Sequence, residues 1–110
     1  MGDDLKGVVS FHGSLGGLPV HNNSAKTKML ICQGEADQIS PIPILEKFTK
    51  SLDSAHADYD VKRYAGAQHS FTNPASTDAG KKFKLPVAYN GAADTASWND
   101  MKTFLGKIFR

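Results

Sequence analysis

The chain has 110 residues, with 13 Lys and Arg against 11 Asp and Glu, which gives a formal net charge of +2. This length supports one compact domain, residues 1–110, that is large enough to bury a hydrophobic core. A content of 40% apolar and 22% charged residues excludes a disordered tail, a coiled coil and a collagen-like repeat. The near balance of charges gives no indication of a nucleic-acid partner.

Hydropathy and cysteine content indicate the cellular compartment of the protein. No apolar run approaches the ~20 residues that cross a bilayer, so no membrane partner is expected. The N-terminus, Met-Gly-Asp-Asp-Leu-Lys, is acidic where a signal peptide is basic and then apolar. The single cysteine, Cys32, excludes an internal disulfide and a CxxC site. Together these features predict a cytoplasmic protein.

Three short apolar runs predict β-strands. They cover residues 7–12 (GVVSFH), 28–33 (KMLICQ) and 60–64 (DVKRY). The second run has four consecutive apolar residues, which is typical of a strand buried on both faces. Such strands belong to parallel sheets that are covered by helices.

Helical patterns separate and follow these strands. A helix is predicted from about residue 43, where Pro is tolerated in the first turn, with an apolar stripe of Ile44, Leu45, Phe48 and Leu52. Residues 65–91 lack regular periodicity, apart from a short helix at about 78–83. A final helix is predicted over about 93–109, and its stripe of Trp98, Met101, Leu105 and Ile108 makes Trp98 a candidate core anchor. The pattern predicts an α/β fold with a mostly parallel sheet of about three strands and flanking helices.

Two side chains with acid–base chemistry follow neighbouring strands. Asp37 comes just after the strand at 28–33, and His69 comes just after the strand at 60–64. The carboxyl ends of parallel strands meet at one edge of the sheet, where ligands and catalytic groups gather. A carboxylate that holds an imidazole in one tautomer prepares it as a general base. We therefore take Asp37 as the candidate catalytic acid and His69 as the candidate catalytic base.

Each of these residues also has a purely structural interpretation. Asp37 precedes a turn and a helix, where Asp commonly accepts hydrogen bonds from backbone N–H groups. His69 lies in a loop rich in Gly and Ala, where a hydrogen-bonded polar residue without a chemical role is an alternative. Glu35, two residues nearer the strand, competes with Asp37 as the acid.

The sequence offers no clear nucleophile to act with the candidate acid and base. It should be a Ser or Cys on a sharp strand-to-helix turn between small residues. Ser14, in HGSLG, is the nearest imitation, but the chain after it continues into a loop. Cys32 lies inside an apolar strand, where burial raises the pKa of a thiol and makes it inert. No metal and no cofactor are expected, because no metal-binding spacing occurs among the histidines His12, His21, His56 and His69.

Taken together, these motifs resemble the dienelactone hydrolase family of α/β-hydrolases. The matching stretches are GVVSFHGSL (7–15), MLICQGEADQISP (29–41), YAGAQHSFTNP (64–74), LPVAYNGAAD (85–94) and SWNDMKTFLGKIF (97–109). The resemblance implies a three-layer, partial α/β-hydrolase fold in which Asp37 is the triad acid and His69 the triad base. It also implies hydrolysis of small esters or lactones, without a metal, by a Cys nucleophile in a G-x-C-x-G turn.

The resemblance covers only the C-terminal half of a full-length member. In the family the nucleophile turn lies upstream of the strand at 7–12, so we expect a truncated chain that is inactive until a partner segment complements it. Without the neighbouring strand, the edge of the sheet is unpaired, which predicts a homodimer or a larger assembly. Two alternatives stay open: a non-catalytic module that self-associates or binds a small ligand, and a gene fragment with no evolved role.

Overall fold

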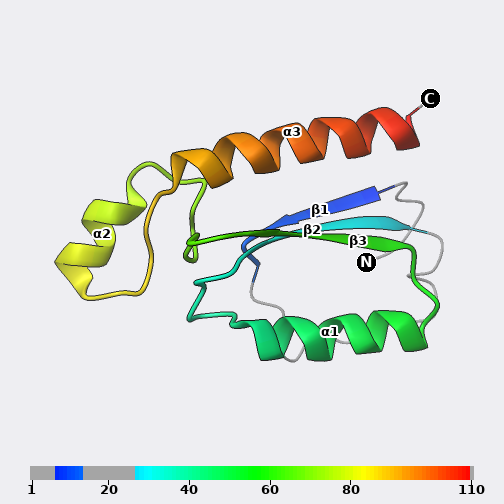
Figure 1. Ribbon diagram of the computed structural model, residues 1–110, viewed down its shortest axis with the longest axis horizontal. Helices are drawn as coiled ribbons and strands as arrows, with labels where there is room; N and C mark the ends of the chain where they lie inside the picture. Colours follow the sequence, from blue (N-terminus) through cyan, green and yellow to red (C-terminus); the bar gives the residue numbers. More distant parts are fainter. Residues whose placement is uncertain (1–6, 14–26, 110) are drawn as a thin grey trace.

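A parallel sheet lies between two helices, so the fold has three layers (Figure 1). The computed structural model describes residues 7–13 and 27–109. In chain order its elements are β1 (Gly7–Phe11), β2 (Lys28–Gly34), α1 (Ile42–Ser54), β3 (Tyr59–Tyr64), α2 (Ser76–Phe83) and α3 (Gly91–Ile108). The strand order is β1-β2-β3, and both pairings are parallel. This confirms the predicted α/β class and the predicted sheet.

The central strand β2 is buried on both of its faces. Leu30 and Cys32 pack in the cluster beneath α3, whereas Ile31, between them, packs against α1. Each of these three side chains is at most 2% exposed. Burial on both faces is what the continuous apolar run of β2 predicts, because a helix covers each side of the sheet.

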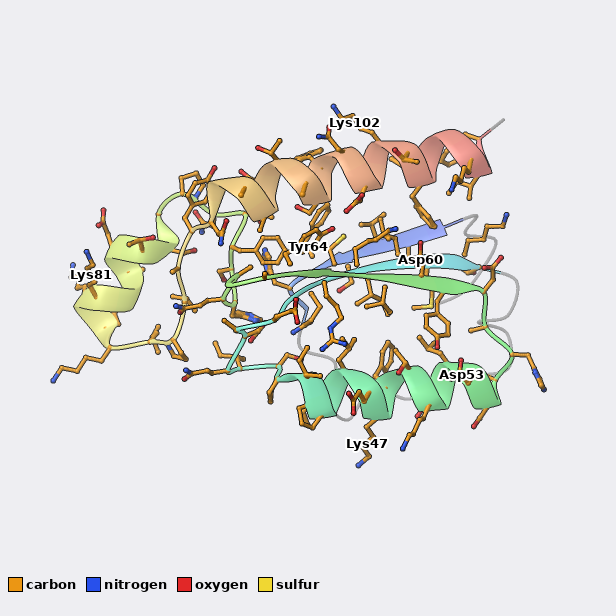
Figure 2. The ribbon with its side chains drawn as sticks, viewed as in Figure 1. Lys47, Asp53, Asp60, Tyr64, Lys81 and Lys102 are labelled. Atoms are coloured by element: carbon orange, nitrogen blue, oxygen red, sulfur yellow. The ribbon has the colours of Figure 1, made fainter. Side chains whose placement is uncertain are left out.

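Helix α1 covers the lower face of the sheet in Figure 1. Its buried side chains, Leu45, Phe48 and Leu52, recur at three and four residues and lie on one stripe. Lys47 points away from the sheet, as Figure 2 shows. Full burial of one such apolar side chain contributes about 1.5–3 kcal/mol, so this stripe fixes α1 on the sheet.

Helix α3 covers the opposite face, but the prediction that Trp98 is a core anchor is wrong. Trp98 is 51% exposed, and its ring lies beside that of Phe11 at a centroid distance of 6.1 Å. The residues that α3 buries fully are small, Ala93 and Ser97. A spacing of three and four residues fits both the predicted stripe of Trp98 and a neighbouring stripe that contains Ala93 and Ser97. The small residues of the second stripe allow the helix to approach the sheet more closely on that side. Met101 lies on both stripes and is half-buried.

The segment between β3 and α3 has little regular structure, yet it is tied to the rest of the domain. Helix α2 begins at Ser76, two residues before the predicted start, and the Ser76 hydroxyl donates to the Ser70 carbonyl over 3.0 Å. His69 and Val87 form an isolated parallel bridge, and the Ala88 N–H donates to the His69 carbonyl over 3.3 Å. The loop after β3 is therefore fixed from two sides.

Candidate active site

The candidate acid and base lie at the carboxyl edge of the sheet. β2 ends at Gly34, three residues before Asp37, and β3 ends at Tyr64, five residues before His69. Because the two strands are parallel and adjacent, their ends lie at the same edge. Oδ2 of Asp37 and Nδ1 of His69 are 2.9 Å apart, within hydrogen-bond distance. The two side chains meet where the sequence places them, and their role in catalysis stays a prediction.

Asp37 uses both of its carboxylate oxygens. Oδ1 accepts from the N–H groups of Ile39, over 2.9 Å, and of Ser40, over 2.8 Å, while Oδ2 faces His69. The side chain of Asp37 is fully buried. The structural and the chemical interpretations of Asp37 therefore hold together: one oxygen closes the turn before α1, which aims the other at the imidazole. The N-cap residue of α1 itself is Pro41.

The bond to Asp37 determines what His69 can do chemically. An ionised carboxylate only accepts hydrogen bonds, so Nδ1 of His69 carries the hydrogen of this bond. In the neutral ring Nε2 then holds a lone pair, and the carboxylate stabilises the imidazolium that forms when Nε2 takes a proton. The side chain of His69 is 17% exposed, compared with 0% for Asp37. This is the arrangement of a general base oriented by a buried acid.

A close backbone contact brings the two loops together. The Ala36 N–H donates to the Ala67 carbonyl over 2.9 Å, which joins the loop of Asp37 to the loop of His69. Gly34 makes this approach possible, because a Cβ atom there would lie 2.2 Å from the Ala67 oxygen. Gly66, at φ +70°, turns the second loop back toward the first.

His12 is a member of this site that the sequence reasoning missed. Its ring lies edge-on to the ring of His69, at a centroid distance of 5.6 Å, and to that of Phe71, at 5.0 Å. Burial lowers the pKa of His12, and the positive charge of His69 lowers it further. The available signal was its place at the carboxyl end of the run at 7–12, the edge at which Asp37 and His69 follow the other two strands.

The lowered pKa of His12 predicts a pH dependence of folding. Above the ordinary value of 6.5 both the folded and the unfolded chain hold His12 neutral. Below it, the unfolded chain takes a proton that the folded chain resists, so the free energy of unfolding falls as the pH falls. Urea unfolding at about pH 8 and about pH 5 should show a smaller loss in His12→Asn than in the wild type. Equal losses in the two proteins would contradict this origin.

The competing candidates lie elsewhere. Glu35 is exposed and faces Arg63 at 3.9 Å, so it does not take the place of Asp37 beside the imidazole. Cys32 is completely buried in β2, and burial raises the pKa of its thiol, as the sequence predicts for an inert cysteine. Ser14 lies outside the described residues.

Within residues 7–13 and 27–109, no group of three or more His, Cys, Asp or Glu side chains is placed to hold a metal ion. A cavity of about 230 Å³ lies between α3 and the sheet, toward the start of β2 and β3 and the end of α3. Its lining includes Lys28, Asp58 and Ile108 but neither Asp37 nor His69, so it is separate from the candidate active site. None of the described helices is long and apolar enough to cross a bilayer.

A parallel sheet with helices on both faces, with an acid and a His after adjacent strands, is the arrangement of the later part of an α/β-hydrolase. The sequence model of the dienelactone hydrolase family matches residues 1–109. The chain belongs to the dienelactone hydrolase family.

Comparisons with individual proteins agree with this assignment. The chain is 27% identical over 113 residues to the uncharacterized protein K02A2.1 of Caenorhabditis elegans, covering 97% of this chain and 67% of that protein. Its fold is similar to the dienelactone hydrolase-like promiscuous phosphotriesterase P91 from metagenomic libraries, with a TM-score of 0.83 and 24% identity. The structure named m3DLH gives a TM-score of 0.80 and 25% identity. Both structural comparisons cover 97% of this chain, which spans 44% of either solved chain.

Proposed function

We propose that this chain supplies the acid and the base of a dienelactone hydrolase-like site that cleaves small carboxylic esters or lactones. The observation that carries the proposal is the contact of 2.9 Å between Asp37 and His69, made by a fully buried carboxylate at the carboxyl edge of the sheet. Membership of a hydrolase family supports it. The single cysteine of the sequence, Cys32, is completely buried in β2, so in this proposal a complementing segment supplies the nucleophile, a Cys on a sharp turn, and the chain alone does not turn over ester.

In this proposal His69 moves the protons and Asp37 remains ionised. Nε2 of His69 takes the proton of the nucleophilic thiol, and the thiolate attacks the ester carbonyl. The imidazolium then gives that proton to the departing alkoxide, which leaves an acyl-thioester on the nucleophile. Nε2 next takes a proton from water, and the hydroxide attacks the acyl carbon. The C–S bond then breaks, and the imidazolium returns its proton to the departing thiolate, which regenerates the thiol and releases the free acid. Throughout, Asp37 holds the Nδ1 hydrogen and stabilises the charged ring.

Complementation tests this proposal. The chain is mixed with a separately expressed N-terminal segment of a family member that carries the Cys turn, and hydrolysis of 4-nitrophenyl acetate is followed. We expect background rates from either part alone, turnover from the complex, and loss of that turnover in His69→Ala. His56→Ala is the control, since His56 lies in the connection between α1 and β3, at the other end of the sheet. A folded complex without turnover, or turnover that survives His69→Ala, would refute the proposal.

A second candidate function is self-association, with or without small-ligand binding, by a non-catalytic form of the fold. The strand order favours it, because among the described strands β1 pairs only with β2 and has no partner on its other edge. Trp98, which is 51% exposed, lies beside Phe11 at the end of this strand. An unpaired edge next to an exposed aromatic ring is a surface that another copy of the chain can cover.

Light scattering over a range of protein concentrations measures this association. We expect a homodimer or larger assembly whose mass falls toward that of the monomer in Trp98→Lys. Phe109→Lys is the matched control, because Phe109 is similarly exposed, at 63%, but lies after the far end of α3. A wild-type monomer at high concentration would exclude association through β1.

A further inference from the structure

The end of β1 places His12 in contact with the loop that carries His69. The His12 N–H donates to the Cys32 carbonyl over 2.9 Å, which extends the pairing of β1 with β2 by one residue. At His12 the backbone then turns into the left-handed region, with φ 42°. A residue other than Gly is uncommon there, although His, Asn and Asp are tolerated better than most. The turn takes the chain out of the sheet and leaves the imidazole at the carboxyl edge.

Three residues of the loop after β3 hold the His12 ring. Nε2 of His12 lies 2.8 Å from the hydroxyl of Thr72, within hydrogen-bond distance, although the two residues are 60 positions apart. The ring of Phe71 meets it at an interplanar angle of 80°, and that of His69 at 66°. These contacts place the His12 ring next to His69 on the side that faces β1. Asp37 contacts His69 from the loop after β2.

We propose that His12 is a positioning residue for His69, one that keeps the His69 ring in the orientation in which Nδ1 faces Asp37. This inference rests on the proposed role of His69 as a base. Asp37 fixes one atom of the ring, and a single hydrogen bond leaves the ring free to swing about that atom. An edge-on aromatic contact restricts that swing, because such pairs prefer a defined mutual angle. His12 itself is held by Thr72, so the restraint is transmitted from a fixed group.

The electrostatics agree with this role. The ionisable side chains that act on His12 among the described residues are His69, which opposes its protonation, and Asp37, which favours it. Phe71 and Thr72, its other neighbours, are uncharged. Burial and His69 together lower the pKa of His12, which favours the neutral form of its ring. A neutral neighbour does not compete for Asp37 and does not repel the His69 imidazolium.

Nitrogen-15 NMR of the histidine-labelled chain tests this inference without any enzymatic activity. In the wild type we expect neutral His69 as the tautomer with the hydrogen on Nδ1, with slow exchange of that hydrogen with water. In His12→Asn, which keeps a residue that tolerates the left-handed backbone, exchange of the Nδ1 hydrogen should become about tenfold faster, the effect of losing one ordinary contact. His56→Asn is the matched control, since His56 has the same backbone conformation, with φ 55°, away from the site.

Thr72→Val keeps the experiment decisive if His12→Asn does not fold. It preserves the shape of Thr72 and removes its hydroxyl from Nε2 of His12, so exchange of the His69 hydrogen should accelerate in the same direction. Unchanged tautomer and exchange in the folded variants would overturn the role of His12 and leave the proposed base intact. A wild-type His69 that lacks the Nδ1 hydrogen would overturn the proposed base, and with it this inference.

The same spectra give a second readout, which tests the contact between the two rings. In His69→Gln the pKa of His12 should rise, because the positive charge that opposes its protonation is gone. The same titration in His56→Asn should return the wild-type value for His12. A His12 pKa that does not respond to the loss of His69 would overturn the contact between the two rings.

Discussion

Asp37→Asn is expected to lower ester turnover of the complemented enzyme by about 10³–10⁴-fold while the domain stays folded. The Asn oxygen can replace Oδ1, which accepts from the N–H groups of Ile39 and Ser40, so the turn before α1 survives. In place of Oδ2, however, the amide presents a donor to Nδ1 of His69. The ring must then carry its hydrogen on Nε2, and the lone pair that takes the proton of the nucleophile is lost.

Two further variants separate chemistry from folding in this prediction. Asp37→Ala loses the turn bonds as well, so its free energy of unfolding should fall by about 1–3 kcal/mol, in addition to the loss of turnover. Asp53→Asn is the matched control, since Asp53 is a carboxylate of α1 that accepts from the Tyr59 hydroxyl, over 2.6 Å, on an exposed surface. Turnover within tenfold of the wild type in Asp37→Asn would show that the carboxylate is not needed.

Gly34→Ala is expected to lower the free energy of unfolding by about 3 kcal/mol, at the upper end of the range for overpacked positions. The added Cβ would lie 2.2 Å from the oxygen and 2.8 Å from the carbon of the Ala67 carbonyl. Both are backbone atoms, and the oxygen is already held by the Ala36 N–H. Relief therefore requires the two loops to separate, which would also draw Asp37 away from His69.

Gly106→Ala is the control for this substitution, and it should act in the opposite direction. A Cβ at Gly106 meets no atom within 4 Å, and the residue lies inside α3. Ala in a helix interior is favoured over Gly by about 0.5–1 kcal/mol, so thermal unfolding of this variant should shift upward. If Gly34→Ala unfolded at the temperature of Gly106→Ala, the close approach of the two loops would not be a determinant of the fold.

Much of the fold can be predicted because its signals are local. The apolar run of β2 and the stripe of Leu45, Phe48 and Leu52 each indicate an element and the face that it buries. The orientation of α3 could not be predicted in the same way. Its packing face is made of small residues such as Ala93 and Ser97, which carry little hydrophobic signal, whereas Trp98 carries much and is 51% exposed. Close approach of a helix depends on side-chain volume, which a hydrophobic stripe does not measure.

The candidate site likewise contains one contact that could be predicted from the sequence and one that could not. The approach of Asp37 to His69 could be predicted, because adjacency of parallel strands brings the residues after them together. The contact between His12 and Thr72 could not, since it depends on a left-handed turn at one residue and spans 60 positions. Glu35 differs from Asp37 by two positions only, and the direction in which each carboxylate points follows from the turn that Asp37 closes.

The burial of Cys32 gives this domain an internal reporter of its own opening. The thiol is completely inaccessible, in the central strand and inside the apolar cluster beneath α3, and the sequence has no other cysteine. A thiol reagent can therefore label the chain only when the layers above β2 come apart, and one adduct per molecule records each such event. The labelling rate, followed by mass spectrometry, would show whether a partner segment or a second copy keeps the sheet closed for longer.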